Sequence, residues 1–240
     1  MYLENLVIDA VEPQRLGRFW EAVVRGERLT DEPDAFETRL TIEGGEPMLD
    51  LCFQRVPELP SEPLRLHLDL HGGARQPEEV DRLLGLGARQ LDVGQVDVPW
   101  VVLADPEGNP FCVMEDRAAY VDTGPIAALP LDSADPDHDG EFWSWLTGWT
   151  DAPGVAPRTL RHPSLRGPLL ELCPEPARKG TAKNRLHLDI RLETGDDPDE
   201  VAAGIAERGG RNLHPDWGAL PWRVHADPSG NELCVLPARS

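Results

Sequence analysis

Two spacings of apolar residues alternate along the first half of the chain, and each predicts a different element. Residues 3–9 are largely apolar and predict a strand. A helix is expected next, because apolar side chains then recur three and four positions apart at Leu16, Phe19, Trp20, Val23 and Val24. Gly26 follows as a residue type that often ends a helix. Two further strands are predicted at 38–42 and 48–53, joined by a turn at Gly44-Gly45.

The pattern then starts again. Residues 64–70 alternate between apolar and polar and predict a strand. Residues 77–86 predict a helix with proline in its first turn and Gly87 at its end. Residues 100–103 and 111–114 predict a hairpin, and the segment Asp105-Pro106-Glu107-Gly108-Asn109 between them has the proline and glycine of a tight turn. We interpret that motif as a turn that need not contact a ligand.

The motifs of the first half return in the same order about 120 residues later. Leu64-Arg65-Leu66-His67-Leu68-Asp69-Leu70 returns as Asn184-Arg185-Leu186-His187-Leu188-Asp189-Ile190. The Asp-Pro-x-Gly-Asn turn and its Cys-Val pair return at 227–235, and the Phe-Trp pair of the first helix returns at 142–143. The segments Leu49-Asp50-Leu51-Cys52 and Pro99-Trp100 also have counterparts, at 170–173 and 221–222. So many motifs in one order indicate a tandem duplication.

Each half therefore contains a strand, a helix and three strands, twice over. We expect an α+β fold of four βαβββ modules that pair to form open β cups. The predicted domains are 1–119, with modules 1–58 and 59–119, and 120–240, with modules 120–177 and 178–240. The loop signal Thr123-Gly124-Pro125 lies beside this boundary.

Strand alternation gathers polar side chains on one face. Because successive side chains of a strand point to opposite faces, Leu66, Leu68 and Leu70 share one face and His67 and Asp69 share the other. The same reasoning sets Asp50 apart from Leu49 and Leu51, and Cys112 apart from Phe111 and Val113. If the leucines pack beneath helices, a carboxylate, an imidazole and a thiol face the open cup, where they can hold zinc, iron or another first-row metal.

The order of elements, the Phe-Trp pair, the His-Leu-Asp strand and the terminal Asp-Pro-x-Gly-Asn hairpin resemble the vicinal oxygen chelate (glyoxalase/bleomycin-resistance/dioxygenase) superfamily, once per half. The resemblance implies cups built from paired modules around a small-molecule site. It implies one of two functions. One is a metal-assisted lyase, isomerase or related enzyme that acts on a small oxygenated metabolite. The other is metal-free binding of a drug or similar ligand.

The resemblance also implies a ligand set. It assigns Asp50, His67 and Cys112 to the metal in the first half and Glu171, His187 and Cys234 in the second, with cysteine where the family's enzymes usually carry glutamate. The remaining family position falls near Tyr2 and Pro125, which are poor metal ligands. Asp69 and Asp189 are expected to bind substrate or to pair with the histidines. The metal would be zinc, iron, nickel or manganese, or absent altogether, and the cysteines serve either as ligands or as small buried residues.

The net charge of −20 excludes some partners. Nucleic acid and anionic membranes both attract basic surfaces, so neither is expected. The charge and the seven tryptophans would suit a cationic aromatic ligand. The chain shows neither a secretory signal nor a long apolar run, so we expect a cytoplasmic monomer or homodimer with four reduced cysteines.

Overall fold

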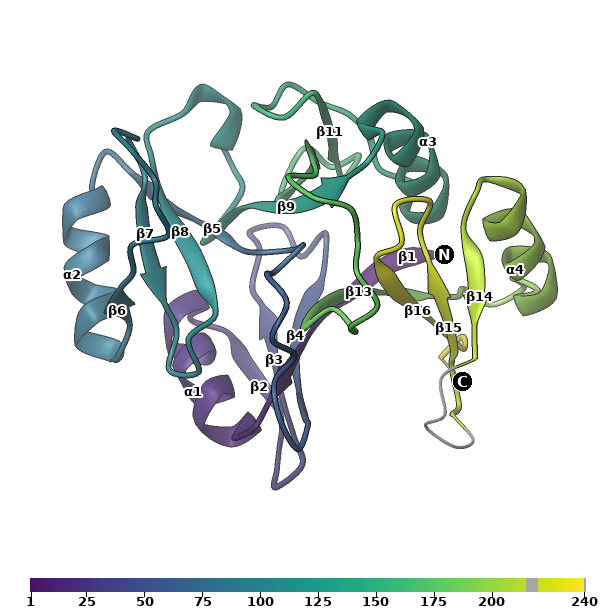
Figure 1. Cartoon of the computed structure of the whole chain (residues 1–240), viewed down its shortest axis with the longest axis horizontal. Helices are drawn as coiled ribbons and strands as arrows, with labels where there is room; N and C mark the ends of the chain where they lie inside the picture. The colour runs from purple at the N-terminus through teal and green to yellow at the C-terminus, as the bar shows by residue number, and fades with distance from the viewer. Residues whose placement is uncertain (215–219, 240) are drawn as a thin grey trace.

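The computed structural model describes residues 1–214 and 220–239. The four predicted modules appear in order along the chain (Figure 1). The first module contains β1 (Tyr2–Ala10), α1 (Pro13–Val24), β2 (Glu27–Glu32), β3 (Ala35–Leu40) and β4 (Leu49–Arg55). The second contains β5 (Asp69–Gly73), α2 (Gln76–Leu86), β6 (Arg89–Gln90), β7 (Val101–Ala104) and β8 (Pro110–Glu115).

The second half repeats this series after a short 3-10 helix, η1 (Ala118–Tyr120). The third module contains β9 (Ile126–Ser133), α3 (Pro136–Thr147), β10 (Thr150–Asp151), β11 (Arg158–Arg161) and β12 (Leu169–Pro174). The fourth contains β13 (Leu186–Arg191), α4 (Pro198–Glu207), β14 (Arg211–Leu213), β15 (Arg223–Ala226) and β16 (Glu232–Leu236). Short strands such as β2 and β6 complete the modules and were not placed individually from the sequence. The strand predicted at 64–70 is also shorter than expected, since only a single bridge at Leu66 precedes β5.

The sixteen strands of the described residues form two mixed sheets, and each sheet joins modules from different halves. Sheet A has the order β14-β15-β16-β13-β1-β4-β3-β2, and sheet B has the order β10-β11-β12-β9-β5-β8-β7-β6. The first strands of two modules meet antiparallel at the centre of each sheet, β1 with β13 and β5 with β9. The first module thus pairs with the fourth and the second with the third. This differs from our expectation that each half would form its own cup.

A single hydrophobic core, formed by strand and helix residues of both halves, joins the two sheets. Leu66, Leu68 and Leu70 are buried in one core with residues of the helices, as the alternation predicted. In that core Trp20 and Phe111 meet edge to face, with their ring centroids 5.1 Å apart. The four helices lie on the outside, α1 and α2 towards one side and α3 and α4 towards the other (Figure 1).

The Asp-Pro-x-Gly-Asn motif is a turn, as predicted. Its aspartate also accepts a hydrogen bond from the helix of the preceding module. Gly108 has a positive φ of 86°, and the Asp105 carboxylate accepts hydrogen bonds from the backbone of Glu107 and Asn109. The same carboxylate accepts a hydrogen bond from the indole nitrogen of Trp20, at 3.2 Å. Trp143 and Asp227 repeat this contact at 3.2 Å in the second half. We call each such tryptophan–aspartate pair an indole clasp.

Among the described residues, no helix combines the length and apolar character that crossing a membrane requires.

Candidate metal and ligand sites in the two cups

Sheet B brings together His67, Asp69 and Cys112. Asp69 lies beside Cys112 in the register of β5 and β8, and His67 Nε2 is 3.4 Å from Asp69 Oδ1. One ligand atom of each residue lies within 4.8 Å of the other two. We call this group the sheet B trio. It offers nitrogen, oxygen and sulfur donors, a set that suits zinc or another first-row metal.

Sheet A holds the same arrangement in His187, Asp189 and Cys234. His187 Nε2 is 3.4 Å from Asp189 Oδ1 and 3.6 Å from Cys234 Sγ. We call this group the sheet A trio, and its three ligand atoms also lie within 4.8 Å of one another. All three residues are buried, whereas the side chain of His67 is 36% exposed. The sheet B trio is therefore the more accessible of the two.

Several buried polar atoms at these trios make no hydrogen bond of good geometry, although the neighbouring histidine Nε2 lies 3.4 Å from each aspartate Oδ1. They are Asp69 Oδ1, Asp189 Oδ1 and His187 Nδ1. An unpaired buried polar atom costs about 1–3 kcal/mol, so native proteins rarely leave such atoms without a partner. A cation or a polar ligand held by these two matched clusters would supply the bonds that the three atoms lack. The residues present therefore fit a metal ion.

The thiols of the trios are held in their protonated form by their surroundings. Burial raises the pKa of Cys112, and the charge of Asp69 raises it further. Burial and Asp189 act in the same way on the pKa of Cys234. Neither thiol is a reactive nucleophile in this environment. Each can become a thiolate ligand only if a cation displaces its proton.

The structure corrects the grouping of the two predicted carboxylate ligands. We expected Asp50 beside His67 and Glu171 beside His187. Asp50 instead lies in sheet A, opposite Asn5, and Glu171 lies in sheet B, opposite Pro130. The cause is the pairing of modules from different halves. The last strand of each module lies in the same sheet as its first strand, so Asp50 on β4 is in sheet A with β1, and Glu171 on β12 is in sheet B with β9.

Asp50 is already neutralised in sheet A. Arg39 donates two hydrogen bonds to it, from Nε to Oδ1 and from Nη2 to Oδ2, each 2.7 Å long. The side chain of Asp50 is only 1% exposed, so this ion pair is held within the cup wall. Asp50 is not part of the sheet A trio.

Glu171 has no such partner. In sheet B the residue opposite it on the neighbouring strand is Thr159, whereas Arg39 stands opposite Asp50 in sheet A. Glu171 is buried, and its Oε1 has no hydrogen-bond partner. Burial, reinforced by the nearby charge of Asp69, raises the pKa of Glu171 to about 7. Glu171 shares a row of the sheet with His67, because Pro130 lies opposite Glu171 and accepts a hydrogen bond from the backbone of His67 on its other side. Asp69 and Cys112 lie in the row of Ala128.

Asn5 is a residue of the site that the sequence analysis missed. It lies between Asp50 and Asp189 in the register, and its side-chain amide donates to Asp189 Oδ2 at 3.2 Å. We had placed the corresponding family position near Tyr2. The available signal was an asparagine that follows Glu4 in a largely apolar strand. Ala128 occupies the matching place beside Asp69 in sheet B.

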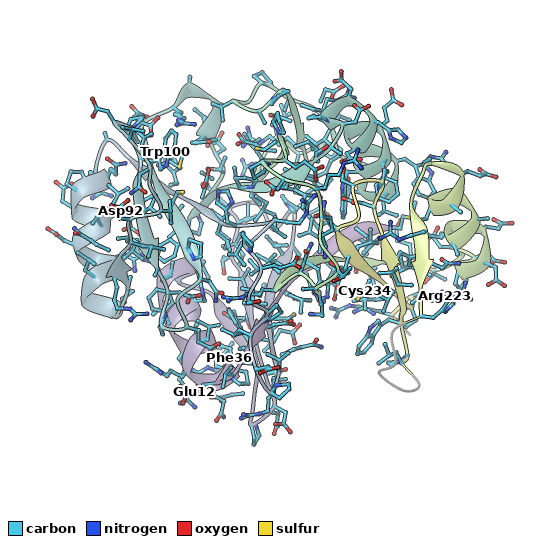
Figure 2. All side chains as sticks on the ribbon, in the orientation of Figure 1. Glu12, Phe36, Asp92, Trp100, Arg223 and Cys234 are labelled. Carbon is cyan, nitrogen blue, oxygen red and sulfur yellow. The ribbon has the colours of Figure 1, made fainter. Side chains whose placement is uncertain are left out.

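The cavities beside the trios differ in character. The sheet B cavity, about 540 Å³ in volume, reaches His67 and Cys112 and has apolar walls that include Leu64, Trp100 and Val102. The sheet A cavity, about 360 Å³, contains the whole sheet A trio, and its other lining residues include Asn5, Gln54, Lys183 and Arg191. Figure 2 shows Trp100, which lines the sheet B cavity, and Cys234, which lines the sheet A cavity, in separate parts of the molecule.

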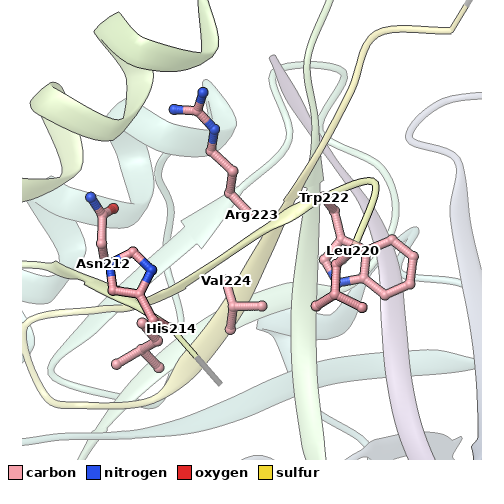
Figure 3. A pocket seen from close by; sticks show the side chains of 7 residues that line it. Asn212, His214, Leu220, Trp222, Arg223 and Val224 are labelled. Atoms are coloured by element: carbon pink, nitrogen blue, oxygen red, sulfur yellow. The ribbon is translucent and has the colours of Figure 1, made fainter. Parts of the chain in front are cut away.

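A further hollow of about 350 Å³ lies over β14 and β15 (Figure 3). Leu220, Trp222 and Val224 line it, while the side chain of Arg223 points away from Trp222 and Leu220. Trp222 also lines the sheet A cavity. This hollow contains neither trio, and we assign no chemistry to it.

Comparison with known proteins identifies the family. The model of the glyoxalase-like domain matches residues 5–114 and again residues 128–236. The chain belongs to the glyoxalase-like family, within the vicinal oxygen chelate superfamily. No curated protein matches this glyoxalase-like chain.

Solved structures agree with the fold. Glyoxalase I from Zea mays is similar, with a TM-score of 0.67 at 15% identity, over 98% of this glyoxalase-like chain and 92% of the maize protein. A putative dioxygenase from Bacillus subtilis is also similar, with a TM-score of 0.61 at 15% identity, over 100% of this chain and 86% of that one. At such low identity these likenesses establish the fold and not the activity.

Proposed function

We propose that this chain is a metal-assisted enzyme of the glyoxalase type that acts on a small oxygenated metabolite in the cup of sheet B. One observation carries the proposal: the same set of imidazole, carboxylate and thiol recurs in both halves, with the donor atoms of each set within 4.8 Å. The two halves have diverged elsewhere, so a set retained in both is better explained by a shared ligand than by packing.

His67, Asp69 and Cys112 would hold the ion in sheet B, and His187, Asp189 and Cys234 would hold one in sheet A. This assignment makes Asp69 and Asp189 metal ligands, where the sequence suggested that they bind substrate. A bound divalent ion of this kind polarises a carbonyl and stabilises the negative charge that develops on its oxygen.

Glu171 is proposed as the group that moves a proton. A general base works best when its pKa lies near the working pH, and the pKa of Glu171 is about 7. Its Oε1 is buried in sheet B without a hydrogen-bond partner. Asp50 has no comparable role in sheet A, because Arg39 holds both of its oxygens. We therefore place the chemistry in sheet B.

The test is cobalt(II) titration of protein stripped with chelator, followed by calorimetry and near-ultraviolet absorption. Wild type is expected to bind one ion per cup with a sulfur-to-cobalt charge-transfer band. His67→Ala and Cys112→Ser should remove the sheet B ion and leave the sheet A ion, and His187→Ala and Cys234→Ser should do the reverse. His138→Ala, on the exposed start of α3, is the control. Absence of heat at millimolar cobalt in wild type would refute the metal site.

The alternative is metal-free binding of a small ligand. The protonated state of Cys112 and Cys234 and the apolar walls of the sheet B cavity favour it. It predicts ligand binding that chelator does not alter.

A further inference from the structure

The sheet B cavity is lined by an arginine, Arg185, that forms no ion pair with any residue the structure describes. Arg185, which precedes β13, lines this cavity together with His67, Cys112 and Trp100. Its Nε donates to the carbonyl of Pro60 at 2.7 Å, and its Nη1 donates to the side-chain oxygen of Asn109 at 2.9 Å. Both acceptors are neutral. Across residues 1–214 and 220–239, no carboxylate oxygen lies within the 4.0 Å of an ion pair with Arg185, and no hydrogen bond from its Nη2 is found.

Comparison with the equivalent arginine of the first half, Arg65, shows which interaction Arg185 lacks. Arg65 is the counterpart of Arg185, because the backbone carbonyl of Arg65 accepts from Asp132 and that of Arg185 accepts from Asp9, both at 2.8 Å. Arg65 Nε donates to the side-chain oxygen of Asn231, as the Nη1 of Arg185 does to that of Asn109. In addition, Arg65 Nη2 forms an ion pair with Glu175 Oε2 at 2.8 Å. Within the part of the chain that the structure describes, Arg185 has no equivalent pair.

The place of Glu175 is taken by a valine in the first half. The backbone of Glu175 donates to Ser133 at 2.8 Å, and the backbone of Val56 donates to Ala10 at 2.9 Å. Val56 therefore holds the matching place beside the first strand of its module, although the repeated Leu-Asp/Glu-Leu-Cys motif aligns Gln54 with Glu175 in sequence. Both follow the last strand of their module. A half-buried guanidinium without a counter-charge is costly, and a bound anion would restore the balance that Glu175 gives to Arg65.

The rest of the cavity is apolar. Leu64, Trp100, Val102, Pro110 and Phe111 form much of its wall, and its volume of about 540 Å³ is ordinary for a small organic ligand. Glu62 also lines the cavity, but its Oε1 accepts a hydrogen bond from the backbone of Ala182 at 3.4 Å and it is not paired with Arg185. The cavity therefore combines an apolar body with one positive end.

We propose that the sheet B cavity takes an amphiphilic carboxylate, with an aromatic or branched apolar body against Trp100 and its carboxylate paired with Arg185. This proposal rests on the proposed function only in taking the sheet B cup as the working site, and it names the substrate class of that site.

The test compares two probes that share one skeleton, 4-phenylbutyrate and 4-phenyl-1-butanol, by calorimetry on metal-free protein in chelator. Wild type is expected to prefer the carboxylate by about tenfold, the effect of one charge-assisted hydrogen bond. Val56→Glu supplies the carboxylate that Arg65 has and leaves Arg185 in place, so it should abolish the preference. Val56→Gln, of the same size but uncharged, should retain it. Trp100→Ala should weaken both probes alike.

Arg185→Gln should also remove the preference while sparing the alcohol. A purely structural role for Arg185, as a link between Pro60 and Asn109, would weaken both probes equally. The proposal is overturned if wild type does not prefer the carboxylate, if neither probe binds at millimolar concentration, or if Val56→Glu keeps the preference. Because the assay contains no metal, a negative cobalt titration with a positive probe result would refute only the metal site, and the converse would refute only the ligand class.

Discussion

Replacing His225 by leucine is expected to make the protein less sensitive to acid. His225 lies on β15, only 1% exposed, and neither of its ring nitrogens has a hydrogen-bond partner. Burial, helped by the nearby charges of Arg223 and His214, lowers its pKa from 6.5 to about 4. The matching position in the first half is Leu103, which is 0% exposed. The two halves of the chain therefore bury a histidine and a leucine at equivalent positions.

The magnitude follows from proton linkage. Between pH 6.5 and pH 4 the unfolded chain binds a proton at this position and the folded chain does not, so stability falls as the pH drops through this window. The full loss, below pH 4, is up to about 3 kcal/mol, since one pKa unit is worth about 1.4 kcal/mol. At pH 5 about 2 kcal/mol of it is already lost. His225→Leu removes this loss and also removes two unpaired buried nitrogens.

Urea unfolding at pH 8 and pH 5 provides the measurement. The stability advantage of His225→Leu over wild type should grow by about 2 kcal/mol between the two pH values. Other titrating groups cancel in this difference, because both proteins carry them. Leu103→His is the reciprocal variant. It should be less stable than wild type, by a larger margin at pH 5 than at pH 8. An advantage that is equal at pH 8 and pH 5 would show that His225 is not held neutral by burial.

Three further changes have clear expectations. Trp20→Phe and Trp143→Phe each break an indole clasp and should lower the free energy of unfolding by about 1–3 kcal/mol, because a buried carboxylate loses a donor; unchanged urea midpoints would contradict this. Arg39→Met should cost about 3 kcal/mol by leaving Asp50 buried without its partner, and adding Asp50→Leu should restore much of the loss; equal stabilities of single and double variants would argue against a buried ion pair. Glu171→Gln should stabilise the protein relative to wild type at pH 8 more than at pH 5. The raised pKa makes wild type lose up to about 3 kcal/mol as the pH rises from 4.5 through about 7, and a pH-independent difference in urea unfolding would refute it.

The sequence predicted the module order and the faces of the strands, because both depend on local periodicity. His67 and Cys112 reach a cavity and Leu66 and Leu68 reach the core, as alternation requires. Phe142 and Trp143 pack in the core as expected for an apolar helix stripe.

The sequence did not indicate which modules pair with each other to form a sheet. Every module begins with a strand of similar apolar character, so nothing local distinguishes a β1–β5 pairing from the observed β1–β13 pairing. Because the module pairing was predicted wrongly, Asp50 was assigned to the cup of His67 and Glu171 to the cup of His187. The clasp between Trp20 and Asp105 also escaped notice, since a turn motif and a helix motif 85 residues apart give no sign that they touch.

The antiparallel meeting of β1 with β13 and of β5 with β9 has a consequence for symmetry. Two separate copies of one half could join the same edges as a two-fold dimer, and its two cups would then have to be identical. Linking the halves in one polypeptide lifts that constraint. Asn5 and its counterpart Ala128 can then differ, and so can Val56 and its counterpart Glu175. One polypeptide thereby carries two cups that are free to diverge separately while sharing a single folded scaffold.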